Sequence, residues 1–428
     1  MLTHKETSPM RLLHITGGSR FGGVAKIILP LGQVAQADGW KVDVLTTDPV
    51  FQQAVRQHGL GLVNLDVIRR EIRPIWDLSG LVRLRNFLRR ESYQIVHTHT
   101  SKAGFVGRLA ARLAGVPVIV HTAHGFAFHE SSPASTRLFY SSLERIASRW
   151  CDRIVTVSEF HRRWAIELGM CSPRRIIAIP NGIGDVGRSH EVGLTELRRQ
   201  LGARDGDLMI LSMARLAEDK GLEYLIKAAS ILPRTGRRIL VAIAGSGPAR
   251  DRLEQLASNL GVSDRVVFLG FRQDVGDLLA ACDLVVLPSL REGLSIALLE
   301  AMAAGKPIIA TSIGSQREVA SQAEMACLVR PADALGLGEA ILRLAGDQAL
   351  MARLGTSARA LYESRYTKDR MLHSYRQLYF DLLNAKCPLE ATKATQGYNS
   401  RLAGCQERLS QDYSELVPAP RQPKGGGV

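Results

Sequence analysis

The sequence lacks any long hydrophobic segment. No run of about 18 apolar residues is free of charged side chains, so we expect no membrane-spanning helix. The N-terminal stretch MLTHKETSPMRLLHIT is too polar for a signal peptide, and the short apolar run that starts at Met10 predicts a strand instead. We therefore expect a cytoplasmic protein.

Cysteine and aromatic residues are also scarce. The six cysteines form no CxxC pair and follow no regular spacing, which favours buried, reduced thiols over a disulfide framework. Aromatic residues make up only 6% of the chain, and base stacking needs exposed aromatics among the cations. A nucleic-acid-binding module is therefore the weakest of the alternatives that the basic composition suggests.

The composition that remains is that of a globular protein with a basic first half. Its 428 residues are enough for two domains with separate cores, and 46% hydrophobic with 22% charged residues is ordinary for such a fold. The formal net charge is +14, and residues 1–190 hold 25 Lys and Arg against 14 Asp and Glu, an excess of 11. Such a bias suits a membrane, a nucleic acid or a phosphorylated substrate, and charge alone does not choose among them.

Short β-rich runs alternate with helix-like segments along most of the chain, which predicts α/β domains with parallel, doubly wound sheets. A polar, glycine-containing stretch at 186–206 marks the expected domain boundary, 370–383 is a long final helix, and 386–428 lacks periodicity and is expected to be disordered. The expected strands are 11–16, 40–46, 62–65, 94–97, 118–121, 153–157, 174–180, 208–212, 239–244, 266–269, 284–288, 308–310 and 325–329.

The first strand ends in GGSRFGG, which includes Gly22 and Gly23 and leads into a helix. Glycines at such a turn let backbone N–H groups approach an anion at the helix N-terminus. The spacing is not GxGxxG, so the dinucleotide fingerprint fails. A tight turn without a ligand is the alternative interpretation of this motif.

Histidines gather where two later strands end, in HTHTSKAG and TAHGFAFHE. Five of them lie between residues 97 and 129, and His97 and His99 point to one face of their strand. An HxH pair at a strand end can bind a metal, but no carboxylates with ligand spacing accompany it. We therefore expect structural or substrate-contacting histidines and no metal site.

A basic amphipathic segment spans residues 69–90. Its apolar residues alternate with seven arginines, which include Arg83, Arg85, Arg89 and Arg90. As a helix it would pack its apolar face on the sheet and expose the arginines. The two interpretations are a solvated surface helix and a surface that docks on an anionic membrane leaflet.

The stretch 283–311 of the second half carries two acids at a place where open α/β sheets bind ligands. Glu292 lies in the loop after a buried strand, and Glu300 lies within the following helix. Upstream, Arg215 and Lys220 follow another strand and are well placed for a pyrophosphate. The sequence Asp205-Gly206-Asp207 resembles a metal-binding DxD, but it precedes a strand and predicts a turn.

Together these segments resemble the family 4 retaining glycosyltransferases of GT-B architecture, and those of bacterial capsule, exopolysaccharide and lipopolysaccharide synthesis in particular. The resemblance covers residues 10–383. Its motifs occur in the order GGSRFGG, HTHTSKAG, TAHG, VTVSE, IPNGI, ARLAEDKG, AGSGP, LGFRQD and EGLSIALLEAMAAGKPII.

The resemblance implies two Rossmann-like doubly wound domains that face a cleft. Residues 1–188 would form the acceptor-side domain and 189–369 the nucleotide-sugar-binding domain. A helix at 370–385 would cross back to the first domain, ahead of the disordered tail.

The resemblance also implies residue roles. Arg215 and Lys220 would neutralise the donor diphosphate in place of a metal. Glu300 would accept both ribose hydroxyls. Glu292 would contact the hydroxyls of the donor sugar.

Further roles follow from the same motifs. Backbone N–H groups around Gly293, Leu294 and Ser295 would lie near the donor sugar, and Gly22 and Gly23 near its phosphates. His124 would lie beside the reaction centre, and His99 would face the acceptor.

The implied activity is metal-independent, retaining transfer of a hexose or N-acetylhexosamine from a nucleotide sugar, with UDP expected, to a polyprenyl-diphosphate-linked saccharide at the inner leaflet. No cofactor is expected. A UDP-sugar 2-epimerase of the same architecture is the competing assignment.

Two positions depart from the family pattern. Gly184 follows IPNGI in place of an acid or asparagine. The segment Gly314–Glu318 lacks the second glycine of the usual pair, although Glu318 matches.

Overall fold

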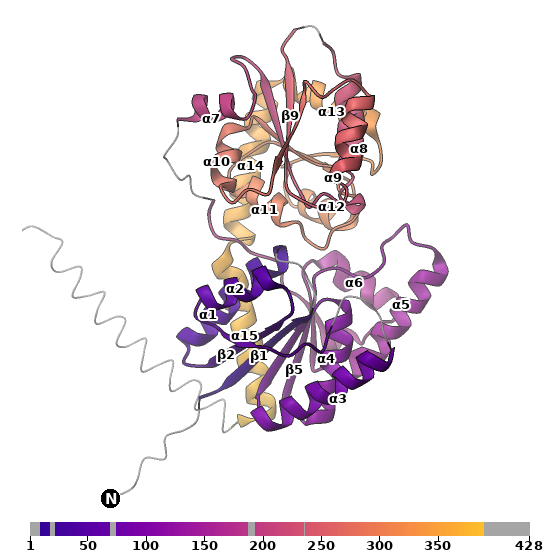
Figure 1. Ribbon diagram of the computed structural model, residues 1–428, viewed down its shortest axis with the longest axis vertical. Coiled ribbons are helices and arrows are strands. Elements are labelled where there is room, and N and C mark those ends of the chain that lie inside the picture. The colour runs from indigo at the N-terminus through magenta and orange to yellow at the C-terminus, as the bar shows by residue number, and fades with distance from the viewer. Residues whose placement is uncertain (1–8, 18–21, 69–73, 187–192, 235, 389–428) are drawn as a thin grey trace, which may run out of the picture.

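Two parallel sheets form the chain's two domains (Figure 1). The computed structural model describes residues 9–17, 22–68, 74–186, 193–234 and 236–388. The first sheet has the strand order β3-β2-β1-β4-β5-β6-β7, and the second has the order β10-β9-β8-β11-β12-β13. The predicted class, two Rossmann-like doubly wound domains, is confirmed.

All strand pairs in both sheets are parallel. The strands of the first sheet are β1 Arg11–Gly17, β2 Lys41–Thr46, β3 Gly61–Val63, β4 Ile95–His99, β5 Val118–Ala123, β6 Arg153–Thr156 and β7 Ile176–Ala178. Those of the second are β8 Leu208–Met213, β9 Ile239–Ala244, β10 Val266–Gly270, β11 Leu284–Leu287, β12 Ile308–Thr311 and β13 Cys327–Val329.

Helices cover both faces of each sheet and bury the apolar strands between them. Those of the first half are α1 Gly23–Ala37, α2 Pro49–Gln57, α3 Pro74–Glu91, α4 Ser101–Ala114, α5 Ala134–Ala147 and α6 Glu159–Glu167. Those of the second half are α7 Leu194–Gln200, α8 Leu222–Ile231, α9 Arg250–Asn259, α10 Val275–Ala281, α11 Ile296–Ala303, α12 Gly314–Ala320, α13 Ala334–Ala345, α14 Gln348–Arg365 and α15 Lys368–Lys386. None of these helices is long and apolar enough to span a membrane.

The order of the strands decides where a ligand can bind. In each sheet, successive strands are first added on one side of the domain's first strand and then on its other side. This reversal lies at β1, which is between β2 and β4, and at β8, which is between β9 and β11. Crevices at the carboxyl ends of such strands are the usual ligand sites of open α/β sheets. Thr16 near the end of β1 and Met213 at the end of β8 line the same cavity, so two such crevices meet there.

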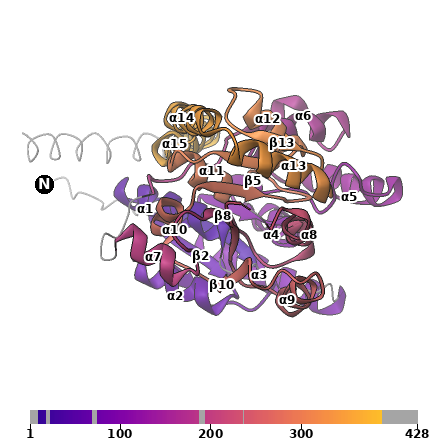
Figure 2. The same cartoon turned by 90° about the horizontal axis from the view of Figure 1, so that it is seen from above.

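The final helix returns to the first domain. In Figure 1, α14 runs down from the second domain and α15 continues along the first, where Met371, Tyr375, Tyr379 and Leu383 are buried in the core beside β1 and β4. Seen from above, the second domain overlies the first, and α5 extends sideways beyond it (Figure 2). The tail predicted to be disordered lies, from residue 389 on, outside the described residues.

Two helices of the structure are absent from the sequence prediction. The first is α2, where Asp48 caps the helix by accepting a hydrogen bond from the Phe51 N–H at 2.8 Å, with Pro49 at the first helical position. An Asp-Pro pair favours a turn as readily as a helix start, and nine residues gave too little periodicity to decide. The second is α12, which lacks a side-chain cap and begins at Gly314.

The Asp205–Asp207 segment is a turn, as predicted. Asp207 is buried, its carboxylate accepts a hydrogen bond from the Arg204 N–H at 2.7 Å, and it pairs with Arg238 at 2.7 Å. Because the Asp207 carboxylate is buried and already bound to these two partners, its role is structural. It lies at the opposite end of β8 from the crevice.

Candidate active site

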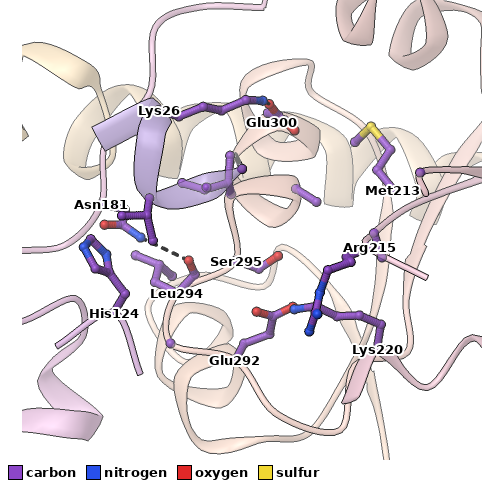
Figure 3. Close-up of a pocket in the computed structure, with 18 of the residues that line it drawn as sticks. Lys26, His124, Asn181, Met213, Arg215, Lys220, Glu292, Leu294, Ser295 and Glu300 are labelled. Carbon is purple, nitrogen blue, oxygen red and sulfur yellow. Dashed lines mark hydrogen bonds and ion pairs between the residues drawn. The ribbon is translucent and has the colours of Figure 1, made fainter. Parts of the chain in front are cut away.

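A cavity of about 760 Å³ lies between the two domains (Figure 3). Most of the predicted site residues line it, although they come from positions far apart in the sequence. Its wall includes Gly22, Gly23, Lys26, His124, Asn181, Arg215, Lys220, Glu292, Gly293, Leu294, Ser295 and Glu300. The fold therefore gathers at one place the groups that the sequence had suggested separately.

Two ion pairs lie on the second domain's side of the cavity, Lys220 with Glu292 and Arg215 with Asp219. Lys220 follows β8, and its Nζ lies 2.6 Å from Oε1 of Glu292 in the loop after β11. The hydroxyl of Ser289 also donates to this oxygen, at 3.0 Å. Arg215 pairs with Asp219 at 3.0 Å, and its side chain is 41% exposed and lines the cavity.

Glu300 lies on α11, deeper in the cleft and only 7% exposed. Its carboxylate pairs with Lys26, which belongs to α1 of the other domain (Figure 3). Lys26 is not among the predicted site residues, although the sequence holds one signal for it. Lys26 lies in the first turn of α1, directly after the Gly22-Gly23 turn, and this position predicts that it faces the same crevice as that turn.

The loop between β11 and α11 approaches the first domain closely. A Cβ atom at Gly293 would lie 1.9 Å from the backbone oxygen of His124, so only glycine permits this contact. The side chain of Asn181 donates to the carbonyl of Leu294 at 3.1 Å across the domain boundary. Ser295 caps α11 by accepting a hydrogen bond from the Leu298 N–H, and the first residues of this helix line the cavity.

The histidines form a connected group beneath the cavity. His124 is half-buried, lines the cavity, and has its Nε2 3.1 Å from Nδ1 of His99. His97 and His99 do point to one face of β4, as predicted, with ring centroids 4.1 Å apart. Burial lowers the pKa of His124 to about 4, so this imidazole is neutral at neutral pH.

The expectation that His99 faces the acceptor is wrong if it means that the His99 side chain touches the acceptor. His99 is completely buried and lines neither cavity described here, because α15 and neighbouring side chains cover this face of the sheet. His99 contacts the cavity wall through His124, whose Nε2 lies 3.1 Å from its Nδ1.

A second cavity of about 490 Å³ adjoins the first. The two share Thr100, His124, Lys220, Glu292 and Gly293 at their boundary. The second cavity adds an aromatic and charged wall from the loop before α5, from α6 and from α12. This wall includes Phe126, Phe128, His129, Glu130, Phe160, Trp164 and Arg317.

The two departures from the family pattern leave the domain contact intact. Glu318 on α12 accepts hydrogen bonds from the backbone N–H groups of Glu159 and Phe160 at the start of α6, where a carboxylate complements the helix dipole. A Cβ at Gly314 would lie 2.2 Å from the Phe160 ring, so a larger residue there would displace this ring. A Cβ at Gly184 would meet no atom within 4 Å.

Comparisons with known proteins agree with this arrangement. Residues 22–182 match the family model described as "Glycosyl transferase 4-like domain", and residues 194–361 match "Glycosyl transferases group 1". The UDP-Gal:alpha-D-GlcNAc-diphosphoundecaprenol alpha-1,3-galactosyltransferase of Escherichia coli is 30% identical over 322 residues, which cover 73% of this chain and 82% of that protein.

Solved structures show the same fold at lower identity. HepE of Anabaena superposes with a TM-score of 0.75 at 22% identity, over 86% of this chain and 99% of that one. WaaG, a glycosyltransferase involved in lipopolysaccharide biosynthesis, superposes with a TM-score of 0.68 at 20% identity, over 85% and 98% of the two chains.

Proposed function

Because the chain belongs to the family 4 glycosyltransferases of GT-B architecture, we propose that it moves a hexose or N-acetylhexosamine from a UDP-sugar to a growing lipid-linked glycan of a surface polysaccharide. The transfer would retain the anomeric configuration and need no metal ion. The 2-epimerase alternative is not favoured, since the relatives compared above are glycosyltransferases.

One observation carries this proposal: Arg215, Lys220, Glu292 and Glu300 line a single cavity, with the two cations from the end of β8 and the two acids from the β11–α11 segment. A nucleoside diphosphate sugar has two negative phosphates between two groups rich in hydroxyls. Cations in the middle of the cavity suit the diphosphate, and a carboxylate on each side suits the ribose and the sugar.

The proposed reaction assigns a task to each group. The bond between the anomeric carbon and the β-phosphate oxygen breaks, and Arg215 and Lys220 stabilise the charge that develops on the departing UDP. The acceptor hydroxyl attacks the same face of the sugar, and its proton passes to the leaving phosphate. Glu292, already bound to Lys220 and Ser289, is assigned to the sugar hydroxyls.

The second cavity is our candidate for the acceptor. It meets the donor cavity at His124 and Glu292, where the transferred sugar would lie. Aromatic rings such as Phe160 and Trp164 suit the apolar faces of saccharide rings, and Arg317 adds a cation for an anionic group of the acceptor. The named acceptor of the Escherichia coli relative is a diphosphoundecaprenol-linked sugar, which supports a polyprenyl-diphosphate-linked saccharide here.

A membrane surface is proposed for the outer side of α3, α4 and α5. These helices pack side by side, and they expose Leu78, Val82, Leu113, Leu138, Phe139 and Ile146. The same part of the chain exposes arginines at positions 83, 89, 90, 112, 145 and 149. Exposed apolar groups together with cations favour an anionic leaflet. Arg69, Arg70 and Arg73 of the predicted segment lie outside the described residues.

We expect the double variant Leu138→Ser and Phe139→Ser to bind anionic vesicles at least about tenfold more weakly, since both side chains lose apolar contact with the bilayer. Co-sedimentation with vesicles of phosphatidylglycerol measures this. The matched control replaces Leu335 and Leu342, two exposed leucines of α13 in the second domain, by serine. Equal binding by all three proteins would remove this surface from the proposal.

A thermal-shift screen with UDP-, GDP- and ADP-sugars tests the donor assignment. Ligand binding to the native state raises the melting temperature, by an amount that grows with concentration over Kd. We expect a UDP-sugar to stabilise the protein most and UDP release to require a glycan acceptor. Stabilisation by another nucleotide alone would exclude UDP. Formation of an epimer without acceptor would restore the isomerase alternative.

A further inference from the structure

Three histidines, two of them buried and the third half-buried, form a line that ends at the cavity. His14 on β1 is fully buried, and its Nδ1 lies 3.0 Å from Nε2 of His99. Nδ1 of His99 in turn lies 3.1 Å from Nε2 of His124, which lines the cavity. Each ring therefore uses one nitrogen for each neighbour, and a buried strand residue is connected to the reaction centre through two hydrogen bonds.

A metal ion is a poor explanation for this group, although His14, His97 and His99 lie close enough to share one. His97 already uses both ring nitrogens, with the Tyr379 hydroxyl at 2.6 Å and the Thr122 hydroxyl at 2.7 Å. Both nitrogens of His99 are also engaged. A metal would have to break these hydrogen bonds, and each buried group left behind would cost free energy.

The far end of the line determines where the protons lie. Nε2 of His14 is buried and has no partner among the described residues. Buried N–H groups without an acceptor are rarer in proteins than buried acceptors without a donor, so this nitrogen should carry no hydrogen. A neutral His14 then carries its hydrogen on Nδ1 and donates to Nε2 of His99.

The position of the hydrogen on His14 determines its position on His99 and His124 as well. His99 accepts at Nε2, so its hydrogen is on Nδ1 and is donated to Nε2 of His124. Burial lowers the pKa of His14 to about 3, that of His99 well below its usual value and that of His124 to about 4, so all three rings stay neutral. The remaining hydrogen of His124 is then on Nδ1, for which no protein partner is seen in the described ranges.

We propose that His14 and His99 are positioning residues that hold His124 in its Nδ1–H tautomer and make it a fixed hydrogen-bond donor toward the transferred sugar. His124 then has no lone pair facing the cleft, because its Nε2 accepts from His99. It acts as an oriented donor and not as a general base. The role of these residues in turnover rests on the proposed glycosyltransferase reaction. The predicted tautomers of the three rings do not depend on that reaction.

The tautomers are measured directly by NMR of the full-length protein with ¹⁵N-labelled histidine, whose ring correlations distinguish Nδ1–H from Nε2–H. We expect Nδ1–H for His14, His99 and His124. Each ring signal is assigned by its disappearance from the spectrum of a variant that lacks that histidine. An Nε2–H or a doubly protonated ring at His124 near neutral pH overturns the proposal. This result does not depend on any substrate.

Kinetics test the consequence. His14→Leu should lower kcat roughly tenfold, the size expected for loss of one orienting hydrogen bond, with a change in donor KM below about twofold. His14→Asn should stay within about threefold of the unaltered enzyme, because the amide nitrogen can donate from the place of Nδ1. The pattern separates positioning from stability, since both variants remove the same ring.

His121 provides the matched control. It is also buried on a strand of the first sheet, and its Nδ1 lies 3.0 Å from the Thr98 hydroxyl, outside the line. His121→Leu should lower the melting temperature without the fall in kcat. Equal kcat losses in His14→Leu, His14→Asn and His121→Leu contradict the positioning role. An enzyme with the expected tautomers but no sugar transfer would refute the proposed function alone.

Discussion

Glu292→Ala is expected to lower kcat for sugar transfer by about a hundred- to a thousandfold, the cost of removing one preorganised charged group from a reaction centre. The Kd for free UDP should change by less than about threefold. Glu292 lies at the boundary of the two cavities, where the sugar would be, and its removal leaves Lys220 available to the phosphates. Steady-state kinetics and calorimetric titration with UDP measure the two quantities.

The control for this variant is Glu218→Ala. Glu218 is an exposed acid two residues before Lys220 and lines neither cavity. Its removal changes the charge of the same loop and should leave kcat unaltered. If Glu292→Ala keeps its turnover, or loses UDP affinity as steeply as activity, Glu292 does not contact the sugar as we assign it.

Glu300→Ala is expected to weaken UDP binding by about a hundredfold. One carboxylate that accepts hydrogen bonds from two ribose hydroxyls contributes about 3 kcal/mol at roughly 1.5 kcal/mol for each bond. The loss should appear in binding and not in folding, because the side chain of its partner Lys26 is 47% exposed and would not be left as a buried charge. Calorimetry with UDP measures the Kd, and a thermal melt measures the stability.

A ligand change supplies the control for Glu300. In the unaltered protein, 2′-deoxy-UDP should bind more weakly than UDP, since one ribose hydroxyl is missing. In Glu300→Ala the two ligands should bind alike, because the carboxylate that distinguishes them is gone. A preference for UDP that survives the substitution would place the ribose elsewhere in the cavity.

The architecture could be predicted from the sequence because each strand is a short, buried, β-rich run bounded by glycine, proline or polar residues. Such patterns are local, and all thirteen expected strands overlap strands of the structure. The loop of Glu292 and the helix of Glu300 follow from the same local signals. The helices α2 and α12 were missed where turn-forming residues coincide with a helix start.

The contacts between domains could not be predicted in this way. Lys26 and Glu300 are 274 positions apart, and no local pattern links them. The burial of His99 has a similar cause. The HxH spacing fixes which face of β4 the rings occupy, but the covering side chains include Tyr379 of α15, which bonds His97 from 282 positions away.

We propose metal-independent transfer with retention, by a site in which Glu292 holds the sugar and Glu300 the ribose. The most direct measurement follows a UDP-sugar and a lipid-linked acceptor analogue by proton NMR in the presence of EDTA. The account predicts one UDP for each sugar transferred, and a product with the anomeric configuration of the donor. An inverted product, an epimerised donor, or activity that returns only with added Mg²⁺ or Mn²⁺ would contradict it.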